Sequence, residues 1–155
     1  MRTNRQGLKL VSHDGQILGS NQDQAGPITE EDYRILTAWR DTLRGFMSAS
    51  KAILKQANVT PNQYQALLAI RFGNQQAQLT VGELAANLHI RHNSAVALIN
   101  KLVGRGTVRR MSSHQDRRVV HLHLTARGET TLRKLVTAHR RELDAVAPTL
   151  RKLLP

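Results

Sequence analysis

The chain has 155 residues, enough for one domain, and its 23 Lys and Arg against 11 Asp and Glu give a formal net charge of +12. That excess of positive charge favours a polyanionic partner. The sequence contains no cysteine, which excludes disulfides, thiol redox chemistry and cysteine-ligated zinc fingers. Because no run approaches about 20 apolar residues, and no apolar signal core follows Met1, we expect a cytoplasmic protein that does not bind membranes.

Residues 1–28 are rich in Gly, Gln, Ser and Asn, and we expect them to be flexible or loosely ordered, with a short hairpin pattern around Asp14-Gly15. One domain is expected over residues 29–155. It begins with a long amphipathic helix over residues 30–57, which needs a large covering surface and therefore predicts dimerisation. The apolar stripe of this helix consists of Leu36, Trp39, Leu43, Phe46, Ser50, Ile53 and Ala57.

A second helix is expected to begin at Thr60-Pro61, where Thr is a good cap and Pro suits the first helical position. Gly73-Asn74 is expected to end it. Its buried positions are predicted to be Tyr64, Leu67, Leu68 and either Ile70 or Phe72.

Two short helices follow, three or four residues apart, and this arrangement predicts a helix-turn-helix. The first opens with a capping box from Thr80 to Glu83 and runs to about His89. The second covers residues 92–103. Its inward positions are predicted to be Ala95, Val96, Leu98, Ile99 and Leu102.

A hairpin and a last helix complete the predicted order. The strands are expected over residues 107–111 and 118–124. Thr125 is expected to cap the last helix, and Pro148 to stop it. The apolar stripe of this helix consists of Leu132, Leu135 or Val136, His139, Leu143 and Val146.

Positive charge is concentrated in the helix-turn-helix and the hairpin. Residues 89–118 contain seven Lys and Arg and a single acid, Asp116, so they carry half of the net charge of the chain. A solvated basic face is the alternative reading. The charge coincides, however, with a helix whose polar face carries small hydrogen-bonding residues, which favours binding to DNA phosphates and base edges.

The start of the helix over residues 92–103 is expected to enter the major groove, so Arg91 to Ser94 are the leading contacts. The hairpin is expected to act as a wing whose Arg117 or Arg118 reaches the minor groove. Asp116 is expected to hold either an arginine or the turn. The predicted DNA-binding residues are Arg91, His92, Asn93, Ser94, Ala97, Asn100, Lys101, Arg105, Arg110, His114, Asp116, Arg117 and Arg118.

Residues 58–129 resemble the MarR family of bacterial transcription regulators. Three departures from the family pattern are Arg91 in place of a small capping Ser, Ala97 in place of a polar contact, and Thr107 in place of Leu. The segments that carry the resemblance are Thr80-Val81-Gly82-Glu83-Leu84-Ala85, Leu98-Ile99-Asn100-Lys101-Leu102, Arg105-Gly106-Thr107-Val108-Arg109-Arg110, Asp116-Arg117-Arg118 and Leu124-Thr125-Ala126-Arg127-Gly128.

The resemblance implies a mainly α (α+β) fold, a winged helix-turn-helix over residues 58–125 with long dimerisation helices at 29–57 and 126–155. It also implies a homodimeric repressor, associated with the nucleoid, that binds a palindromic operator in double-stranded DNA and is released by a small, often aromatic, ligand. The walls of such a ligand pocket are expected to be Trp39, Arg40, Arg44, Tyr64 and Phe72.

Three other functions compete with that of a transcription regulator. His121 and His123 share one strand face, with His89, His92 and His114 near in sequence, but a zinc site needs three or four ligands and only Asp116 adds a carboxylate, so no metal is expected. The motifs of common enzyme classes are absent, so we expect no enzyme and no cofactor. A non-specific architectural DNA-binding protein is the alternative to a regulator, and a specificity ratio distinguishes the two.

Overall fold

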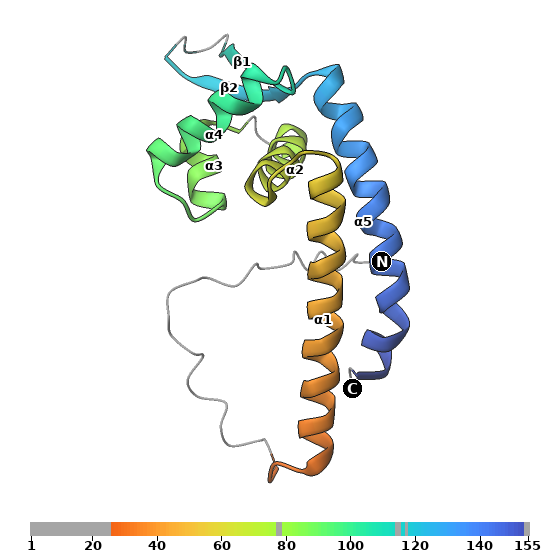
Figure 1. Ribbon diagram of the computed structural model, residues 1–155. Helices are drawn as coiled ribbons and strands as arrows, with labels where there is room; N and C mark the ends of the chain where they lie inside the picture. Colours follow the sequence, from red (N-terminus) through yellow and green to blue (C-terminus); the bar gives the residue numbers. More distant parts are fainter. Residues whose placement is uncertain (1–25, 77–78, 114–115, 117, 154–155) are drawn as a thin grey trace, which may run out of the picture.

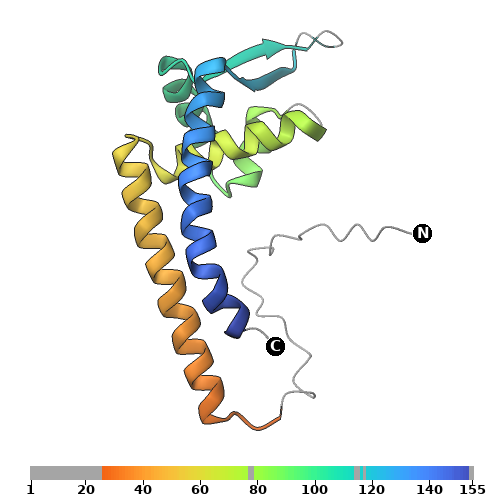
Figure 2. The same cartoon turned by 90° about the vertical axis from the view of Figure 1, so that its right-hand side faces the viewer.

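The computed structural model describes residues 26–76, 79–113, 116 and 118–153. Two long helices run side by side, and the other elements form a lobe at one end of them (Figures 1 and 2). The fold is therefore mainly helical with one small hairpin, as predicted. The elements are α1 (Glu30–Gln56), α2 (Pro61–Gln76), α3 (Val81–Asn87), α4 (His92–Gly104), β1 (Val108–Ser112), β2 (Val120–Leu124) and α5 (Ala126–Leu153).

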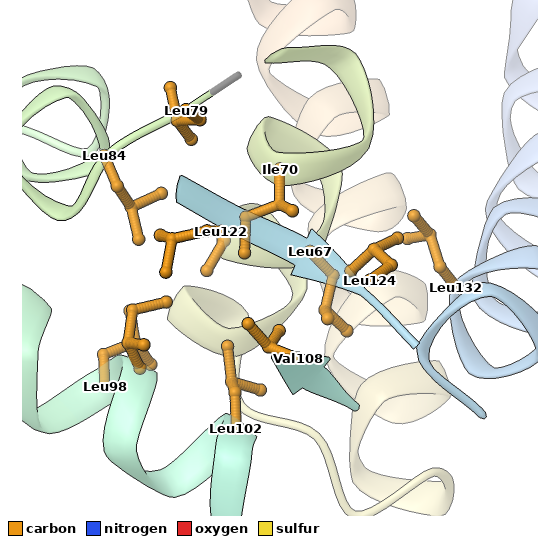
Figure 3. Close-up of a cluster of buried hydrophobic side chains, with 12 residues drawn as sticks. Leu67, Ile70, Leu79, Leu84, Leu98, Leu102, Val108, Leu122, Leu124 and Leu132 are labelled. Atoms are coloured by element: carbon orange, nitrogen blue, oxygen red, sulfur yellow. The ribbon is translucent and has the colours of Figure 1, made fainter. Parts of the chain in front are cut away.

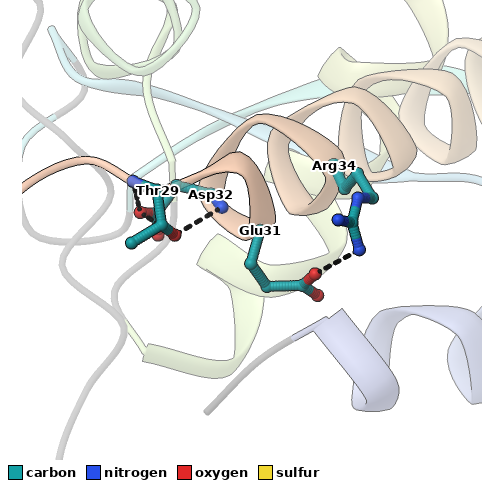
Figure 4. A network of polar contacts seen from close by, with 4 residues as sticks. All are labelled: Thr29, Glu31, Asp32 and Arg34. Atoms are coloured by element: carbon teal, nitrogen blue, oxygen red, sulfur yellow. Dashed lines mark hydrogen bonds and ion pairs between the residues drawn. The ribbon is translucent and has the colours of Figure 1, made fainter.

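Helix α1 begins at a reciprocal cap (Figure 4). The Thr29 hydroxyl accepts the Asp32 amide hydrogen at 3.3 Å, and the Asp32 carboxylate accepts the Thr29 amide hydrogen at 2.7 Å. These bonds from the backbone and then the side chain of Thr29 lower the pKa of Asp32. An exposed pair between Glu31 and Arg34 lies on the next turn. The cap fixes where the helix starts, because it satisfies amides that have no partner within the helix.

A buried histidine joins the two long helices to the lobe. His139 of α5 lies 2.8 Å from the Ser50 hydroxyl of α1 through Nε2, and 2.8 Å from the Leu135 carbonyl oxygen through Nδ1. Because a carbonyl oxygen only accepts, Nδ1 carries the hydrogen, and in the neutral ring Nε2 accepts from Ser50. The ring stacks on Tyr64 of α2 with centroids 4.6 Å apart, and Phe46 of α1 meets its edge. Burial raises the pKa of Tyr64.

The core of the lobe is aliphatic (Figure 3). This follows from the composition, since the chain has only two Phe, two Tyr and one Trp. Burying one aliphatic side chain such as Leu or Ile contributes about 1.5–3 kcal/mol. The buried aliphatic residues of α4 therefore stabilise the lobe directly. Side chains from α2 to α5 meet there, namely Leu67, Ile70, Leu84, Leu98, Ile99, Leu102, Val108, Leu122, Leu124 and Leu132.

The hairpin pairs β1 with β2 in antiparallel register, from Val108 opposite Leu124 to Ser112 opposite Val120. The segment before α3 adds to its edge, because the Leu122 amide donates to the Leu79 carbonyl at 2.8 Å. The second strand begins at Val120, not at residue 118 as predicted. Arg118 and Val119, predicted to be in the strand, instead belong to a turn in which the Val119 amide donates to the Asp116 carbonyl at 3.0 Å.

Two predicted helix ends are wrong. Helix α2 continues past Gly73 to Gln76, and α5 continues past Pro148 to Leu153. Gly73 serves close packing, since a Cβ there would lie 3.0 Å from the Leu79 Cβ. Pro148 removes one amide donor near the end of a long helix, and the helix tolerates that loss.

The structure also decides which apolar positions are inside. Ile70 and Leu135 are buried, so each wins over its alternative, Phe72 and Val136 respectively. Leu68, predicted to be buried, is 37% exposed. The predicted flexible segment lies almost wholly outside the described residues, and so does its hairpin pattern. None of the helices in the described ranges is long and apolar enough to cross a membrane.

Candidate nucleic-acid interface

Helix α4 has one buried face and one exposed face. The buried face carries four of the five predicted inward positions, Ala95, Leu98, Ile99 and Leu102, whereas the fifth, Val96, is only partly buried. The exposed face is polar and basic over two turns, and β1 lies beside it. The exposed residues of this face, which we call the α4 surface, are Arg91, His92, Asn93, Ser94, Ala97, Asn100 and Lys101.

The entry into α4 leaves Arg91 unused by the cap. Arg91 is the N-cap residue in extended conformation, and its side chain makes no capping hydrogen bond. Its carbonyl accepts the amide hydrogens of Ser94 and Ala95 at 2.9 and 3.1 Å. Arg91 stands where the family has a small Ser. Its exposed guanidinium lies at the start of the helix and is available for an external contact.

A side-chain bond links the α4 surface to the hairpin. Arg110 of β1 donates through Nη2 to the Asn100 Oδ1 at 2.9 Å. Because the Asn100 carbonyl is used in this way, its amide nitrogen remains as a donor. Arg109, the next cation on β1, is also exposed and lies opposite His123 in the strand register. Its exposure adds a positive charge that was not among the predicted contact residues.

Arg105 lies apart from the other predicted contacts. It follows the last residue of α4, is half-buried, and donates through Nη1 to the Gln63 Oε1 of α2 at 3.0 Å. This pairing joins residues 42 positions apart in sequence, which is why residue patterns along one helix did not indicate it. The structure therefore does not bring Arg105 together with the α4 surface.

Asp116 organises the wing turn through the backbone. Its Oδ1 accepts the Arg118 amide hydrogen at 2.9 Å, so of the two roles left open, its contacts to the described residues fit the hold on the turn. The Arg118 side chain is exposed. His114 and Arg117 lie outside the described residues.

The cations of this region have no carboxylate partners within the described part of the chain. Its four ion pairs lie on α1 and α5 and between α2 and α5, and none includes Arg91, Lys101 or Arg118. Partial burial, followed by the charges of Arg109 and His121, lowers the pKa of His123, which disfavours a positive charge on this imidazole. Unneutralised guanidinium and ammonium groups are what phosphate binding requires.

The predicted capping box at α3 is confirmed. The Glu83 carboxylate accepts the amide and hydroxyl hydrogens of Thr80, both at 2.8 Å, and the Glu83 amide donates back to the Thr80 hydroxyl. These bonds, the amide first, lower the pKa of Glu83, and His121 adds a smaller effect of the same sign. The cap fixes the start of the first helix of the helix-turn-helix.

Thr107, a departure from the family pattern, is buried without loss. Its hydroxyl donates to the Leu102 carbonyl at 3.0 Å, and its own carbonyl accepts the Thr125 amide hydrogen at 3.1 Å. The hydroxyl is therefore satisfied by the last turns of α4, while the backbone carbonyl of Thr107 joins the exit of α4 to the residue before α5.

The five residues predicted to line a ligand pocket do not lie together around one cavity among the described residues. Trp39, Arg40 and Arg44 are exposed along α1, and Arg44 pairs with Asp41 at 2.8 Å. Tyr64 stacks on His139, while Phe72 is 61% exposed. Among the residues that the structure describes, no group of three or more His, Cys, Asp or Glu could hold a metal ion.

A family model, that of the MarR family, matches residues 57–119, which run from the end of α1 to the wing. This part of the chain resembles a MarR-family winged-helix domain. Within it α3 and α4 form the helix-turn-helix and β1 and β2 the wing. The MarR-type fold also matches a solved structure, the S. aureus MepR–DNA complex, with a TM-score of 0.62 and 19% identity over 74% of this chain and 84% of that one.

Two curated relatives are named as HTH-type transcriptional regulators. YsmB of Bacillus subtilis (strain 168) is 28% identical over 87 residues, 56% of this chain and 58% of its own length. PetP of Rhodobacter capsulatus is 31% identical over 102 residues, 66% of this chain and 60% of its own length. The chain thus spans about three-fifths of the length of these relatives.

Proposed function

We propose that the protein is a homodimeric transcription regulator that binds a palindromic operator in double-stranded DNA and acts as a repressor in the nucleoid. The observation that carries this proposal is the α4 surface, a polar and basic helix face opposite a fully apolar one. Its cations have no carboxylate partners in the described ranges. The relatives named as transcriptional regulators, and the MepR–DNA complex, support the same function.

In this proposal the first turn of α4 enters the major groove. Arg91, His92 and Asn93 are exposed there and supply donors to base edges or phosphates. The Asn100 amide donor is free for an acceptor on a base or a phosphate, while its carbonyl oxygen already accepts one hydrogen from Arg110.

The wing supplies the second contact. Asp116 bonds to the backbone amide of Arg118, and we assign the exposed Arg118 side chain to a minor groove. Arg117 and His114 belong to the same proposed contact. Lys101, in the last turns of α4, is assigned to a phosphate because a flexible ammonium group acts as a point charge.

We further propose release by a small effector. Such a ligand shifts the equilibrium only if it binds the arrangement of lobes that cannot engage DNA more tightly than the arrangement that can. The segment between Trp39 and Arg44 on α1, with Tyr64 and Phe72 on α2, is the proposed binding region.

Fluorescence anisotropy with labelled duplexes tests the wing and α4 assignments. Arg118→Ala should weaken operator binding substantially while the dimer remains intact. Lys101→Ala should weaken all sequences alike and lower the slope of log affinity against log salt by about one unit. Arg151→Ala, an exposed cation at the far end of α5, is the matched control. Unchanged binding in Arg118→Ala, or a changed base preference in Lys101→Ala, would contradict the respective role.

A further inference from the structure

A small hollow lies where four helices meet, at the end of α1, the start of α2, the end of α4 and the start of α5. It has a volume of about 100 Å³, and its walls include Gln63, Leu67, Leu102, Arg105, Arg127 and Thr131. None of the ligand walls proposed on α1 and α2 lines it. No acidic residue lines it either.

Gln63, which lines this hollow, keeps one side-chain donor free of the described residues. The side chain is only 6% exposed, and its Oε1 accepts two hydrogens, from the Thr60 amide at 3.0 Å and from Arg105 Nη1 at 3.0 Å. Those two donors fix the orientation of the amide, because Nε2 could not accept them. Nε2 has no acceptor among the described residues. A buried donor without a partner is unfavourable and points to a ligand or a water.

Two arginines line the same hollow and have no carboxylate partners in the described part of the chain. Arg105 is held by Gln63, and Arg127 is exposed in the first turn of α5. Glu129, the acid nearest in sequence to Arg127, pairs with Arg71 at 3.3 Å. The hollow therefore combines positive charge, an unsatisfied amide donor and the Thr131 hydroxyl over an apolar floor.

We infer that this hollow binds a small oxyanion, such as phosphate, sulfate or a short carboxylate. The guanidinium groups match the planar oxygen pairs of such ions, and the Gln63 amide supplies a further directed bond. The space holds several water molecules but is too small for an extended ligand. The ion is either free in solution or a phosphate of the DNA backbone. As a site for a free ion it stands without the proposed DNA recognition, and as a site for a backbone phosphate it rests on that proposal.

Two substitutions test the site in the full chain. Gln63→Glu keeps the oxygen that accepts from Thr60 and Arg105 but replaces the donor with a second carboxylate oxygen. Arg127→Gln removes one exposed guanidinium. The matched controls are Gln65→Glu, the same change on an exposed position of α2, and Arg133→Gln, an exposed position of α5 outside the hollow.

Calorimetric titration with sodium phosphate at constant ionic strength measures the free-ion source. We expect saturable binding that sulfate displaces, with the dissociation constant raised at least about tenfold in Gln63→Glu and Arg127→Gln and unchanged in both controls. Circular dichroism checks that each variant is folded, and Arg127→Gln, at an exposed position, still tests the site if Gln63→Glu does not fold.

A duplex titration over a range of salt concentrations measures the DNA source. If free phosphate does not bind, but the two hollow variants lower the salt slope by about one unit while the controls do not, the oxyanion is a backbone phosphate. If the variants match their controls in both experiments, the oxyanion site is wrong. Loss of DNA binding by Arg118→Ala is scored separately, so failure of the hollow and failure of the proposed regulator remain distinguishable.

Discussion

At the scale of single residues, the wing turn depends on one carboxylate oxygen. Asp116 Oδ1 accepts the Arg118 amide hydrogen at 2.9 Å, and the Asp116 carbonyl accepts that of Val119 at 3.0 Å. An aspartate whose side chain bonds to the backbone two residues on stabilises a tight turn. The negative charge of Asp116 cannot itself favour DNA, so its value to the wing lies in this geometry.

Asp116→Ala should therefore weaken DNA binding several-fold, because the turn that orients Arg118 loses its side-chain bond. Asp116→Asn keeps a carbonyl oxygen at the same place and should retain most of the affinity, or exceed it, since it removes a negative charge near phosphates. Anisotropy titrations at one fixed salt concentration compare the three proteins. An equal loss in both variants would show that the charge, and not the turn, matters.

The exposed face of α4 could be predicted residue by residue, because helical periodicity decides which side of a helix the core covers. The bonds of Asn100 and Arg105 could not. Asn100 bonds to a strand residue, and Arg105 bonds to Gln63, which precedes it by 42 positions, so both depend on how elements pack. The sequence also leaves two partners for Asp116, an arginine or the turn, because the choice depends on the geometry of the folded turn.

At the scale of elements, hydrogen bonds to backbone groups join the end of α4 to the start of α5. Gly106 takes a positive φ of 68° where the chain leaves α4, a conformation that glycine adopts at little cost. The Thr125 hydroxyl donates to the Gly106 carbonyl at 2.6 Å and accepts the Gly128 amide hydrogen at 3.0 Å. Gly128 itself is buried against Thr107. This junction sets the angle of α5 relative to the lobe.

Gly128→Ala should destabilise the protein by about 1–3 kcal/mol, because the added Cβ would overlap the backbone carbonyl oxygen of Thr107, which cannot move aside as a side chain can. Gly82→Ala, in the first turn of α3, is the control. Its Cβ would meet only the Thr80 hydroxyl oxygen at 4.0 Å, so a gain of up to about 1 kcal/mol from helix propensity is expected.

Urea unfolding followed by circular dichroism measures both changes in the free energy of unfolding. Equal stabilities of the two variants would contradict the close approach at Gly128. The family motif that contains Gly128 is visible in the sequence, but its physical reason is not, because the contact is with Thr107, just before β1, across the junction.

Helix starts were predictable from the sequence and two helix ends were not. Thr80 and Glu83 satisfy each other within four residues, so a local pattern was sufficient. Gly73 and Pro148 were read as stop signals from their intrinsic preferences. Packing against Leu79 keeps Gly73 within α2, and α5 continues for five residues after Pro148 to Leu153.

At the scale of the whole molecule, the two long helices leave apolar side chains uncovered. On α1, Leu36 and Met47 are 60% and 58% exposed, and on α5 Leu143 is 49% exposed. Contiguous exposure of this kind marks an association surface. A second copy related by a two-fold axis would cover the same faces and would present two α4 surfaces about 34 Å apart, one turn of DNA.

The protein should therefore sediment as a dimer, two chains of 17.3 kDa each, at micromolar concentration. Replacing Leu43 and Met47 together by Glu should give a folded monomer, because charges would have to be buried at the contact. Analytical ultracentrifugation measures the mass, and circular dichroism checks the fold. A monomeric parent protein would contradict the dimer, and so would a double variant that stays dimeric.

Sequence-specific recognition of double-stranded DNA is tested most directly by the ratio of the affinities for a specific and a non-specific duplex. Duplexes are selected by the protein from a random pool, and the affinity for the selected site is compared with that for a scrambled duplex at the same salt concentration. A regulator should prefer the selected site, a palindrome, by about 10³-fold or more. Equal affinity for the two duplexes would contradict the regulator and support a non-specific architectural protein.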